Sequence, residues 1–205
     1  MNIITHDWNW AHGLSKRSAT DAIVIHHAAA DTATPEGIHT YHLSQGWAGI
    51  GYHLVIRKDG SVHQGRPLWA SGAQVKDHNW HTVGVCLEGN YDVAGAVVPK
   101  AQMDALHEAL RYLKGIYPDA AVKFHRDFGG SVCPGRYFPT AEALAYEREK
   151  DKVPVDNRPW YIKNGELDEA KALGITDGTR PDDTATRAEV AAMVLRAYKL
   201  GKGDT

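Results

Sequence analysis

Short apolar runs rich in β-branched residues recur along the N-terminal part of the chain and constrain its fold more than any other feature. The run "DAIVIHH" (21–27) predicts a buried strand. The segment "GYHLVIRKDGSVHQG" (51–65) predicts a hairpin that turns at Asp59 and Gly60. A third strand is predicted for "HTVGVCLEG" (81–89). Such strands need a second layer to cover them.

Two segments with helical patterns supply that layer. In "PKAQMDALHEALRYLKGIYP" (99–118), Met103, Leu106 and Leu110 recur at spacings of three and four, which predicts an amphipathic helix. A shorter helix is predicted for "PEGIHTYHLSQG" (35–46). Strands that alternate with helices over residues 1–148 indicate an α/β domain with a central sheet.

The composition changes near residue 148. Residues 149–158 carry charges and proline, which predicts a linker. Residues 159–205 contain two helical patterns and predict a small α-helical module. Four apolar residues of the second pattern would form its packing face: Val190, Met193, Val194 and Ala197. A module this small has little core of its own, which predicts docking on the first domain or pairing between chains.

Charge and hydropathy exclude several classes of function. The 205 residues carry a net charge of −2, so the chain has neither the basic surface of a nucleic-acid-binding protein nor a polybasic membrane patch. Its apolar runs are too short to cross a bilayer, so no membrane insertion is expected. The first residues, "MNIITHDWNWAHG", lack the pattern of a secretory signal, which predicts synthesis in the cytoplasm.

The segment "FHRDFGGSVCPG" (124–135) places His125 and Cys133 at the two ends of a glycine-rich loop. The pair indicates either a metal site or a surface turn with a buried thiol. A third ligand is available in "IVIHHAAA", where His26 and His27 point to opposite faces of the predicted strand, so only one can share a metal with the loop. Two histidines, one cysteine and an open position make a plausible catalytic zinc sphere.

Four blocks, "IVIHHAAA", "GWAGIGYHLVIRKDGSVHQGR", "TVGVCLEGN" and "FHRDFGGSVCPG", resemble in order and separation those of type 2 N-acetylmuramoyl-L-alanine amidases, above all the short endolysins of bacteriophages. The resemblance covers roughly residues 20–145. It implies the fold of the peptidoglycan recognition proteins, a central mixed β-sheet flanked by helices. It also implies that His26, His125 and Cys133 bind Zn²⁺ and that Tyr52 is catalytic.

Two positions depart from the family pattern. Some relatives carry a glutamate base where this chain has Cys86, and Glu88, which shares the strand parity of Cys86, is a candidate to replace it at the substrate. Ser131 stands where the family often has lysine or threonine, and its hydroxyl can still donate a hydrogen bond to an oxyanion. We therefore place Ser131 beside Tyr52 as a second catalytic candidate.

The remaining candidates concern substrate binding. Exposed aromatic residues stack on sugars, although partial burial explains them equally well; those near the predicted site are Trp47, Trp69 and Trp80. Gln74 and Asn79 lie in the loop where relatives contact the peptide. We expect His53 to be a structural sheet residue. Six further histidines are expected to be solvated or lightly packed: His39, His42, His63, His78, His81 and His107.

The resemblance implies a zinc-dependent amidase that cleaves peptidoglycan, with an amidase domain at 1–148. A phage or prophage endolysin that reaches the wall through a holin fits best, and a cytoplasmic amidase that recycles wall fragments is the alternative. A non-catalytic module that binds peptidoglycan is a second alternative, which the presence of Cys133 and Tyr52 disfavours. The segment "ALGITDGTRPDDTATRAEVAAMVLRA" within residues 159–205 resembles a single S-layer homology repeat, which implies binding to a secondary cell-wall polymer.

Overall fold

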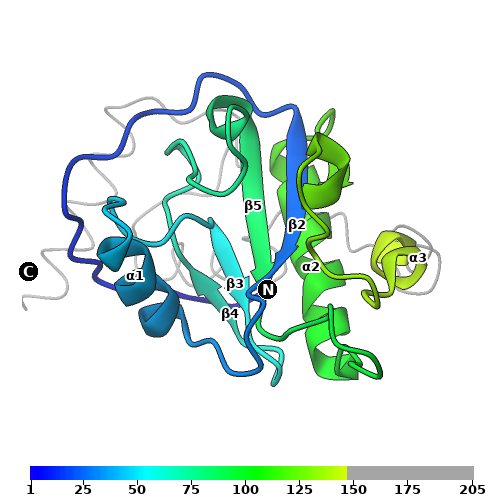
Figure 1. Cartoon of the computed structure of the whole chain (residues 1–205). Coiled ribbons are helices and arrows are strands. Elements are labelled where there is room, and N and C mark those ends of the chain that lie inside the picture. The colour runs from blue at the N-terminus through cyan, green and yellow to red at the C-terminus, as the bar shows by residue number, and fades with distance from the viewer. Residues whose placement is uncertain (147–205) are drawn as a thin grey trace, which may run out of the picture. The chain divides into compact units, whose positions relative to one another are not determined.

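The computed structural model describes residues 1–146, which form a mixed six-stranded sheet in the order β1-β4-β3-β5-β2-β6 (Figure 1). The strands are β1 (Ile3–Ile4), β2 (Ala22–His27), β3 (Leu54–Ile56), β4 (Val62–Gln64), β5 (Thr82–Leu87) and β6 (Ala121–Phe124). Neighbouring strands run parallel except β3 and β4, which are antiparallel. The expected mixed sheet is therefore confirmed. The predicted linker at 149–158 and module at 159–205 lie outside the described residues.

Within residues 1–146, three α-helices and two 3₁₀ helices lie between or after these strands. They are α1 (Pro35–Ser44), α2 (Lys100–Ile116), α3 (Thr140–Ala143), η1 (Asn79–His81) and η2 (His125–Phe128). The α1 helix begins after Thr34, whose hydroxyl accepts a hydrogen bond from the backbone N–H of Gly37 at 3.0 Å. The two long helices match the segments that the apolar periodicity predicts.

One face of the sheet packs against α2. Ile23 and Ile25 of β2 point to this face and are completely buried in the same cluster as Leu106 and Leu110 of α2. Removal of this apolar surface from water is the main stabilising contribution of this layer. The outward side of α2 carries its charged residues, as its amphipathic pattern predicts.

The opposite face packs against α1. Ile38 of α1 lies in a second cluster with Val55 of β3 and Cys86 of β5, and Trp8 and Tyr52 pack against its edge. Side chains alternate between the two faces of a strand. Val24 and His26 of β2 therefore point to this second face. The site described below lies on this side of the sheet.

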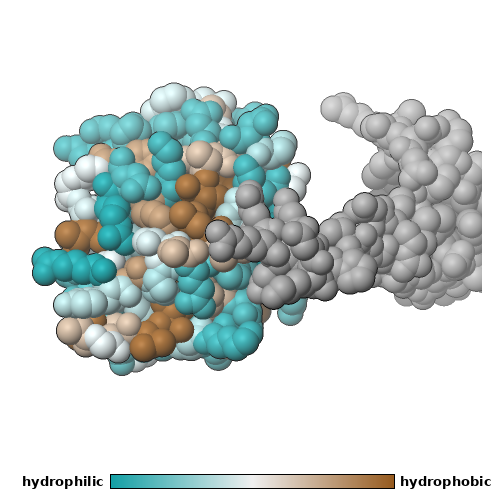
Figure 2. Space-filling view, turned by 90° about the vertical axis from the view of Figure 1, so that its right-hand side faces the viewer, coloured by the Kyte–Doolittle hydropathy of each residue, from teal (hydrophilic) through white to brown (hydrophobic). Residues whose placement is uncertain are grey.

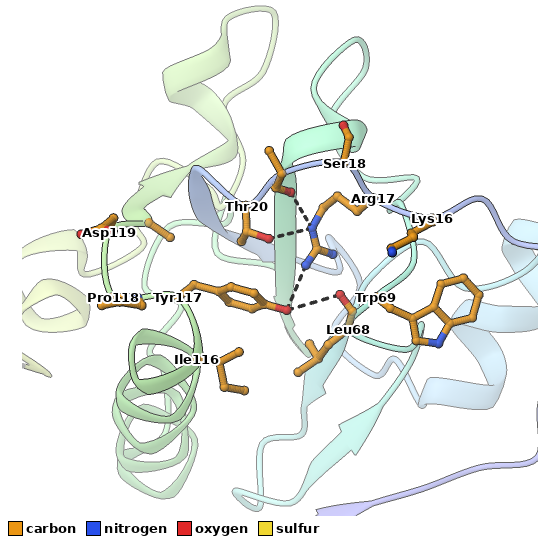
Figure 3. A pocket seen from close by; sticks show the side chains of 12 residues that line it. Lys16, Arg17, Ser18, Thr20, Leu68, Trp69, Ile116, Tyr117, Pro118 and Asp119 are labelled. Carbon is orange, nitrogen blue, oxygen red and sulfur yellow. Dashed lines mark hydrogen bonds between the residues drawn. The ribbon is translucent and has the colours of Figure 1, made fainter. Parts of the chain in front are cut away.

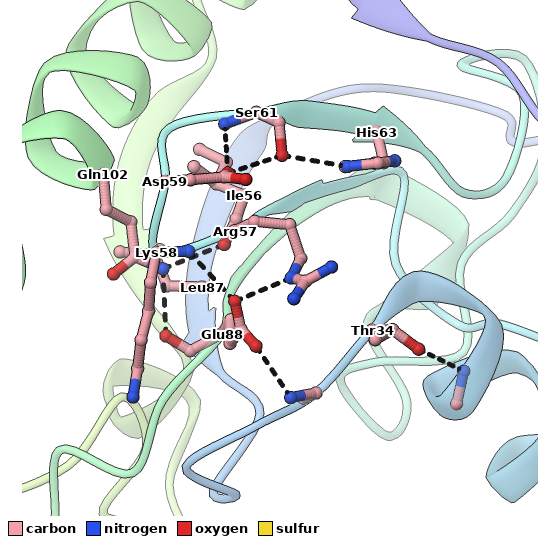
Figure 4. Close-up of polar contacts among 12 residues, drawn as sticks. Thr34, Ile56, Arg57, Lys58, Asp59, Ser61, His63, Leu87, Glu88 and Gln102 are labelled. Atoms are coloured by element: carbon pink, nitrogen blue, oxygen red, sulfur yellow. Dashed lines mark hydrogen bonds and ion pairs between the residues drawn. The ribbon is translucent and has the colours of Figure 1, made fainter.

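The hairpin between β3 and β4 turns where the sequence predicts. Gly60 adopts a positive φ of 87°, and the Asp59 carboxylate accepts a hydrogen bond from the backbone N–H of Ser61 at 2.9 Å (Figure 4). The strand β3 begins only at Leu54. Tyr52 therefore lies just before the strand, where its carbonyl accepts a hydrogen bond from the backbone N–H of Arg66 at 2.8 Å.

The surface of the described residues is mixed in character. Figure 2, which shows the right-hand side of Figure 1, displays hydrophobic residues in small patches between hydrophilic ones. Within residues 1–146, no helix has both the length and the apolar character needed to cross a bilayer.

Candidate metal and active site

The site begins at the carboxyl end of β2, next to β5. His26 pairs in register with Cys86 of β5, and its side chain is only 1% exposed. Its ring centroid lies 5.2 Å from that of Tyr52, which approaches from the residues before β3. The central strands thus bring an imidazole and a phenol together at one end of the sheet.

The glycine-rich loop brings the other two residues to this place. η2 begins at His125, and Gly129 and Gly130 then reverse the chain with φ values of 84° and 68°. The backbone N–H of Arg126 donates to the carbonyl of Cys133 at 2.9 Å and closes the loop. The tight loop is therefore what places His125 beside Cys133.

His26, His125 and Cys133 form a cluster whose potential ligand atoms all lie within 4.8 Å of one another. Cys133 Sγ lies 3.7 Å from His26 Nδ1, and the rings of His26 and His125 have centroids 4.7 Å apart. Among the described residues, this is the only group of three or more histidine, cysteine or acidic side chains with such spacing. These three residues could hold a metal ion.

The protonation of these groups suits a metal. Burial, and then the proximity of a second titratable imidazole in His125, lower the pKa of His26 to about 3, and burial also lowers the pKa of His125, so both imidazoles are neutral at physiological pH. Burial raises the pKa of the Cys133 thiol to about 11. A buried thiolate needs a compensating cation, and two neutral imidazoles with one thiolate are a donor set that suits zinc.

His27 is directed away from this cluster. Its Nδ1 accepts a hydrogen bond from the backbone N–H of Tyr91 at 3.1 Å, on the α2 face of the sheet. Only its backbone N–H approaches the site, at 3.5 Å from Cys133 Sγ. Of the two alternatives in β2, His26 is thus the residue that the fold turns toward the loop.

Two histidines of α1 support the segment that carries Tyr52. His39 Nδ1 accepts from the backbone N–H of Ile50 at 3.2 Å, and His42 Nδ1 accepts from that of Gly51 at 3.0 Å. Both are 6% exposed, so the expectation that they are solvated or lightly packed is wrong. Their spacing of three residues places both on the inner side of α1. This spacing of three is the sequence signal from which the burial of both histidines on one side of the helix could have been predicted.

The other histidines differ in burial. His107 is also buried, at 5%, and contacts the Glu142 carbonyl at 2.8 Å, which corrects the same expectation. His53 is completely buried, and its ring accepts from the backbone N–H of Gly84 at 3.0 Å, as expected for a structural residue. His63, His78 and His81 are partly exposed.

The candidate aromatic residues lie in different places. Trp47 is 42% exposed and its ring lies 4.6 Å from that of His42, whose ring is 5.6 Å from that of Tyr52. Trp47 can therefore form part of a wall near Tyr52. Trp80 is 52% exposed, and its ring lies tilted against that of His81 with centroids 4.2 Å apart.

Trp69 lines a separate pocket, shown in Figure 3, that contains none of the three clustered residues. Arg17 and Tyr117 are joined there by a hydrogen bond of 3.1 Å between the guanidinium and the phenol oxygen. The structure therefore does not place Trp69 at the cluster, because the loop that carries it pairs with the chain before β2.

Gln74 and Asn79 are engaged within the protein. The Gln74 side-chain oxygen contacts His26 Nε2, and its Nε2 donates to the hydroxyl of Thr82 at 2.7 Å. Asn79 Oδ1 accepts from the backbone N–H groups of Gln74 and Val75 at 2.8 and 3.0 Å. Instead of facing substrate as expected, these polar groups organise the loop beside His26.

Glu88 is also placed differently from the expectation that it meets substrate (Figure 4). Its carboxylate is 3% exposed and accepts from Arg57 Nε at 2.7 Å and from the backbone N–H groups of Lys58 and Ala33 at 3.0 Å each. Burial would raise the pKa of Glu88, but the Arg57 guanidinium and these backbone donors hold it below its ordinary value. Glu88 is a structural anchor between β3, β5 and the segment before α1.

Two hydroxyl groups lie near the cluster, those of Tyr52 and Ser131. Burial, and then the nearby Cys86 and Cys133, raise the pKa of Tyr52 well above its ordinary value, so its phenol remains a hydrogen-bond donor. Ser131 Oγ accepts from the backbone N–H of Cys133 at 3.1 Å, which leaves its own hydrogen free to donate.

The sequence profile of the N-acetylmuramoyl-L-alanine amidase family matches residues 16–136, which include the whole cluster. The chain belongs to this amidase family. The endolysin of Enterobacteria phage K11 is 37% identical to this amidase over 144 residues, which cover 65% of this chain and 95% of the relative.

Solved structures agree with this assignment. The amidase LysC from Clostridium intestinale URNW has a TM-score of 0.69 at 36% identity, over 72% of this chain and 98% of that one. Drosophila peptidoglycan recognition protein SD has a TM-score of 0.63 at 20% identity, over 68% and 92% of the two chains. This second likeness shows that the amidase has the recognition-protein fold.

Proposed function

We propose that this amidase is a zinc-dependent endolysin that hydrolyses the amide between the lactyl group of muramic acid and L-alanine in peptidoglycan. The observation that carries the proposal is the convergence of His26, His125 and Cys133 beside Tyr52. Membership of the amidase family and the likeness to phage endolysins support the substrate class.

The three clustered residues would hold the metal. His26 and His125 are neutral and offer nitrogen lone pairs, and Cys133 offers a sulfur. When bound, Zn²⁺ supplies a Lewis acid for the scissile carbonyl and lowers the pKa of a water to about 7.

The protein's own hydroxyl groups would stabilise the developing charge. Because the phenol of Tyr52 stays protonated, it can donate a hydrogen bond to the oxyanion that forms on the substrate carbonyl. The hydroxyl of Ser131 is a second candidate donor at the mouth of the loop. Glu88 is not assigned a role in proton transfer, because Arg57 and two backbone N–H groups occupy its carboxylate.

The wider organisation belongs to the same proposal. Residues 1–148 would form the amidase domain, residues 149–158 a linker, and residues 159–205 a module that resembles an S-layer homology repeat and binds a secondary cell-wall polymer. Such a module would dock on the amidase domain or pair between chains. We also propose that the protein reaches the wall through a holin.

The decisive experiment measures the products formed from purified cell walls. An amidase releases new free α-amino groups on alanine without new reducing sugar ends, and a chelator should abolish this release until zinc is added back. A protein that sediments with walls but frees no amino groups would instead be a binding module. New reducing ends would show cleavage of the glycan and contradict the proposal.

A further inference from the structure

The two ring nitrogens of His26 face different partners. Nδ1 lies on the side of the cluster, 3.7 Å from Cys133 Sγ, whereas Nε2 is hydrogen-bonded to the side-chain oxygen of Gln74. With His26 only 1% exposed, water does not compete for either nitrogen. The state of Nε2 therefore decides whether Nδ1 has a free lone pair.

A chain of hydrogen bonds sets the direction of each donor. The hydroxyl of Thr82 donates to the carbonyl of His78 at 2.8 Å, so its oxygen accepts from the Gln74 amide nitrogen at 2.7 Å. The carbonyl oxygen of the Gln74 side chain must then face His26. Because that oxygen can only accept, His26 Nε2 carries the hydrogen and Nδ1 is left with its lone pair toward the cluster.

The surroundings leave space for this contact. Asn79 Oδ1 accepts from the backbone N–H of Gln74 at 2.8 Å and holds the loop against β5. A Cβ on Gly84 of β5 would lie 2.9 Å from both Cγ and Cδ of Gln74. The backbone of Gly84 has no positive φ, so the space that Gln74 needs is what glycine supplies there.

We infer that Gln74 is a positioning residue that fixes the tautomer and ring orientation of His26, so that Nδ1 is presented as the metal ligand. The inference rests on the proposed function only in taking the cluster as a metal site. Partners that orient a ligand imidazole typically change metal affinity about 10- to 100-fold.

The test replaces Gln74 with methionine, which keeps the length of the side chain and removes the acceptor. In the metal-free wild type, nitrogen-15 NMR should show His26 as the Nε2–H tautomer, and Gln74→Met should give a mixture. Zinc affinity, measured by competition with a chromophoric chelator, should fall by about 10- to 100-fold in Gln74→Met.

Gln102→Met is the matched control. Gln102 is completely buried and donates from Nε2 to the carbonyls of Ile56 and Glu88 at 2.9 Å each, so its loss should reduce stability. Because the Gln102 side chain is engaged with Ile56, Glu88 and Tyr91 and not with the cluster, its variant should keep the His26 tautomer and the wild-type zinc affinity.

A second arm uses Gly84. The variant Gly84→Ala should displace Gln74 and lower zinc affinity, whereas the same change in a Gln74→Ala background should have little further effect. A Nδ1–H tautomer in the wild type, or equal zinc affinities in Gln74→Met and Gln102→Met, would overturn the inference. A wild type that shows the expected tautomer but cleaves no peptidoglycan would instead contradict only the proposed function.

Discussion

His26 and His27 are adjacent in β2, yet their rings lie on opposite faces of the sheet. The ring of His26 lies 5.2 Å from that of Tyr52 and beside Cys133, whereas His27 binds the backbone N–H of Tyr91 on the α2 face. The pleat of the strand causes this separation. His26 can therefore contribute to the cluster, whereas His27 is buried on the α2 side of the sheet.

The first prediction concerns metal binding. Replacing Cys133 with alanine removes the sulfur from the cluster, and we expect the variant to lose its single Zn²⁺ and its activity. His27→Asn is the control, because asparagine can still accept a hydrogen bond from Tyr91. Elemental analysis of the purified proteins measures the result. Full zinc occupancy in Cys133→Ala would contradict the assignment of the ligands.

The second prediction concerns Tyr52. Tyr52→Phe removes one donor to the oxyanion, and we expect turnover to fall by roughly 100- to 1,000-fold with zinc retained. The matched control is Tyr91→Phe, because the Tyr91 hydroxyl shares its one hydrogen between the Glu88 carbonyl, at 2.8 Å, and the side-chain oxygen of Gln102 within the core. That control should unfold more easily but keep its turnover. Wild-type turnover in Tyr52→Phe would transfer the role to another donor such as Ser131.

The third prediction concerns pH and Glu88. Because the pKa of Glu88 is depressed in the folded state, its contribution to the free energy of unfolding is present above the ordinary glutamate pKa of about 4.3. It is lost as the pH falls through the depressed value. Glu88→Gln should therefore lower the free energy of unfolding at pH 7 by roughly 1.5–3 kcal/mol, and by less at pH 3.

Urea denaturation of both proteins at several pH values measures this difference. The control is Asp31→Asn, because Asp31 is 90% exposed where it pairs with Lys58 at 2.5 Å, and exposed pairs contribute little. A Glu88→Gln difference that stays constant between pH 7 and pH 3 would show that the carboxylate charge is not what stabilises the anchor.

The fourth prediction concerns the C-terminal residues, which lie outside the described structure. A chain that ends at Lys152 should fold and cleave soluble muropeptides at the rate of the full chain, because the cluster and its supports lie within residues 1–146. It should lose sedimentation with intact host walls if residues 159–205 bind a wall polymer. Equal sedimentation of the two chains would refute the targeting role.

The sequence by itself determined the local elements and, through the family resemblance, indicated the members of the cluster. Apolar runs rich in β-branched residues at 22–27 and 82–87 and helical periodicity in residues 100–116 appear as β2, β5 and α2, because these patterns depend on neighbours a few residues apart. The short strands β1 and β6 carry no such pattern and form through pairing with β4 and β2. The spacing of His125 and Cys133 likewise indicated their meeting, since the loop between them closes locally.

Only the tertiary structure decided which groups surround the cluster. Glu88 shares strand parity with Cys86, yet Arg57 from the hairpin and Ala33 from the segment before α1 bind its carboxylate. Gln74 reaches His26 because β5 has no side chain at Gly84. A buried polar group needs a hydrogen-bond partner. The partners of Glu88 and Gln74 come from segments far apart in the sequence, so no local sequence pattern predicts them.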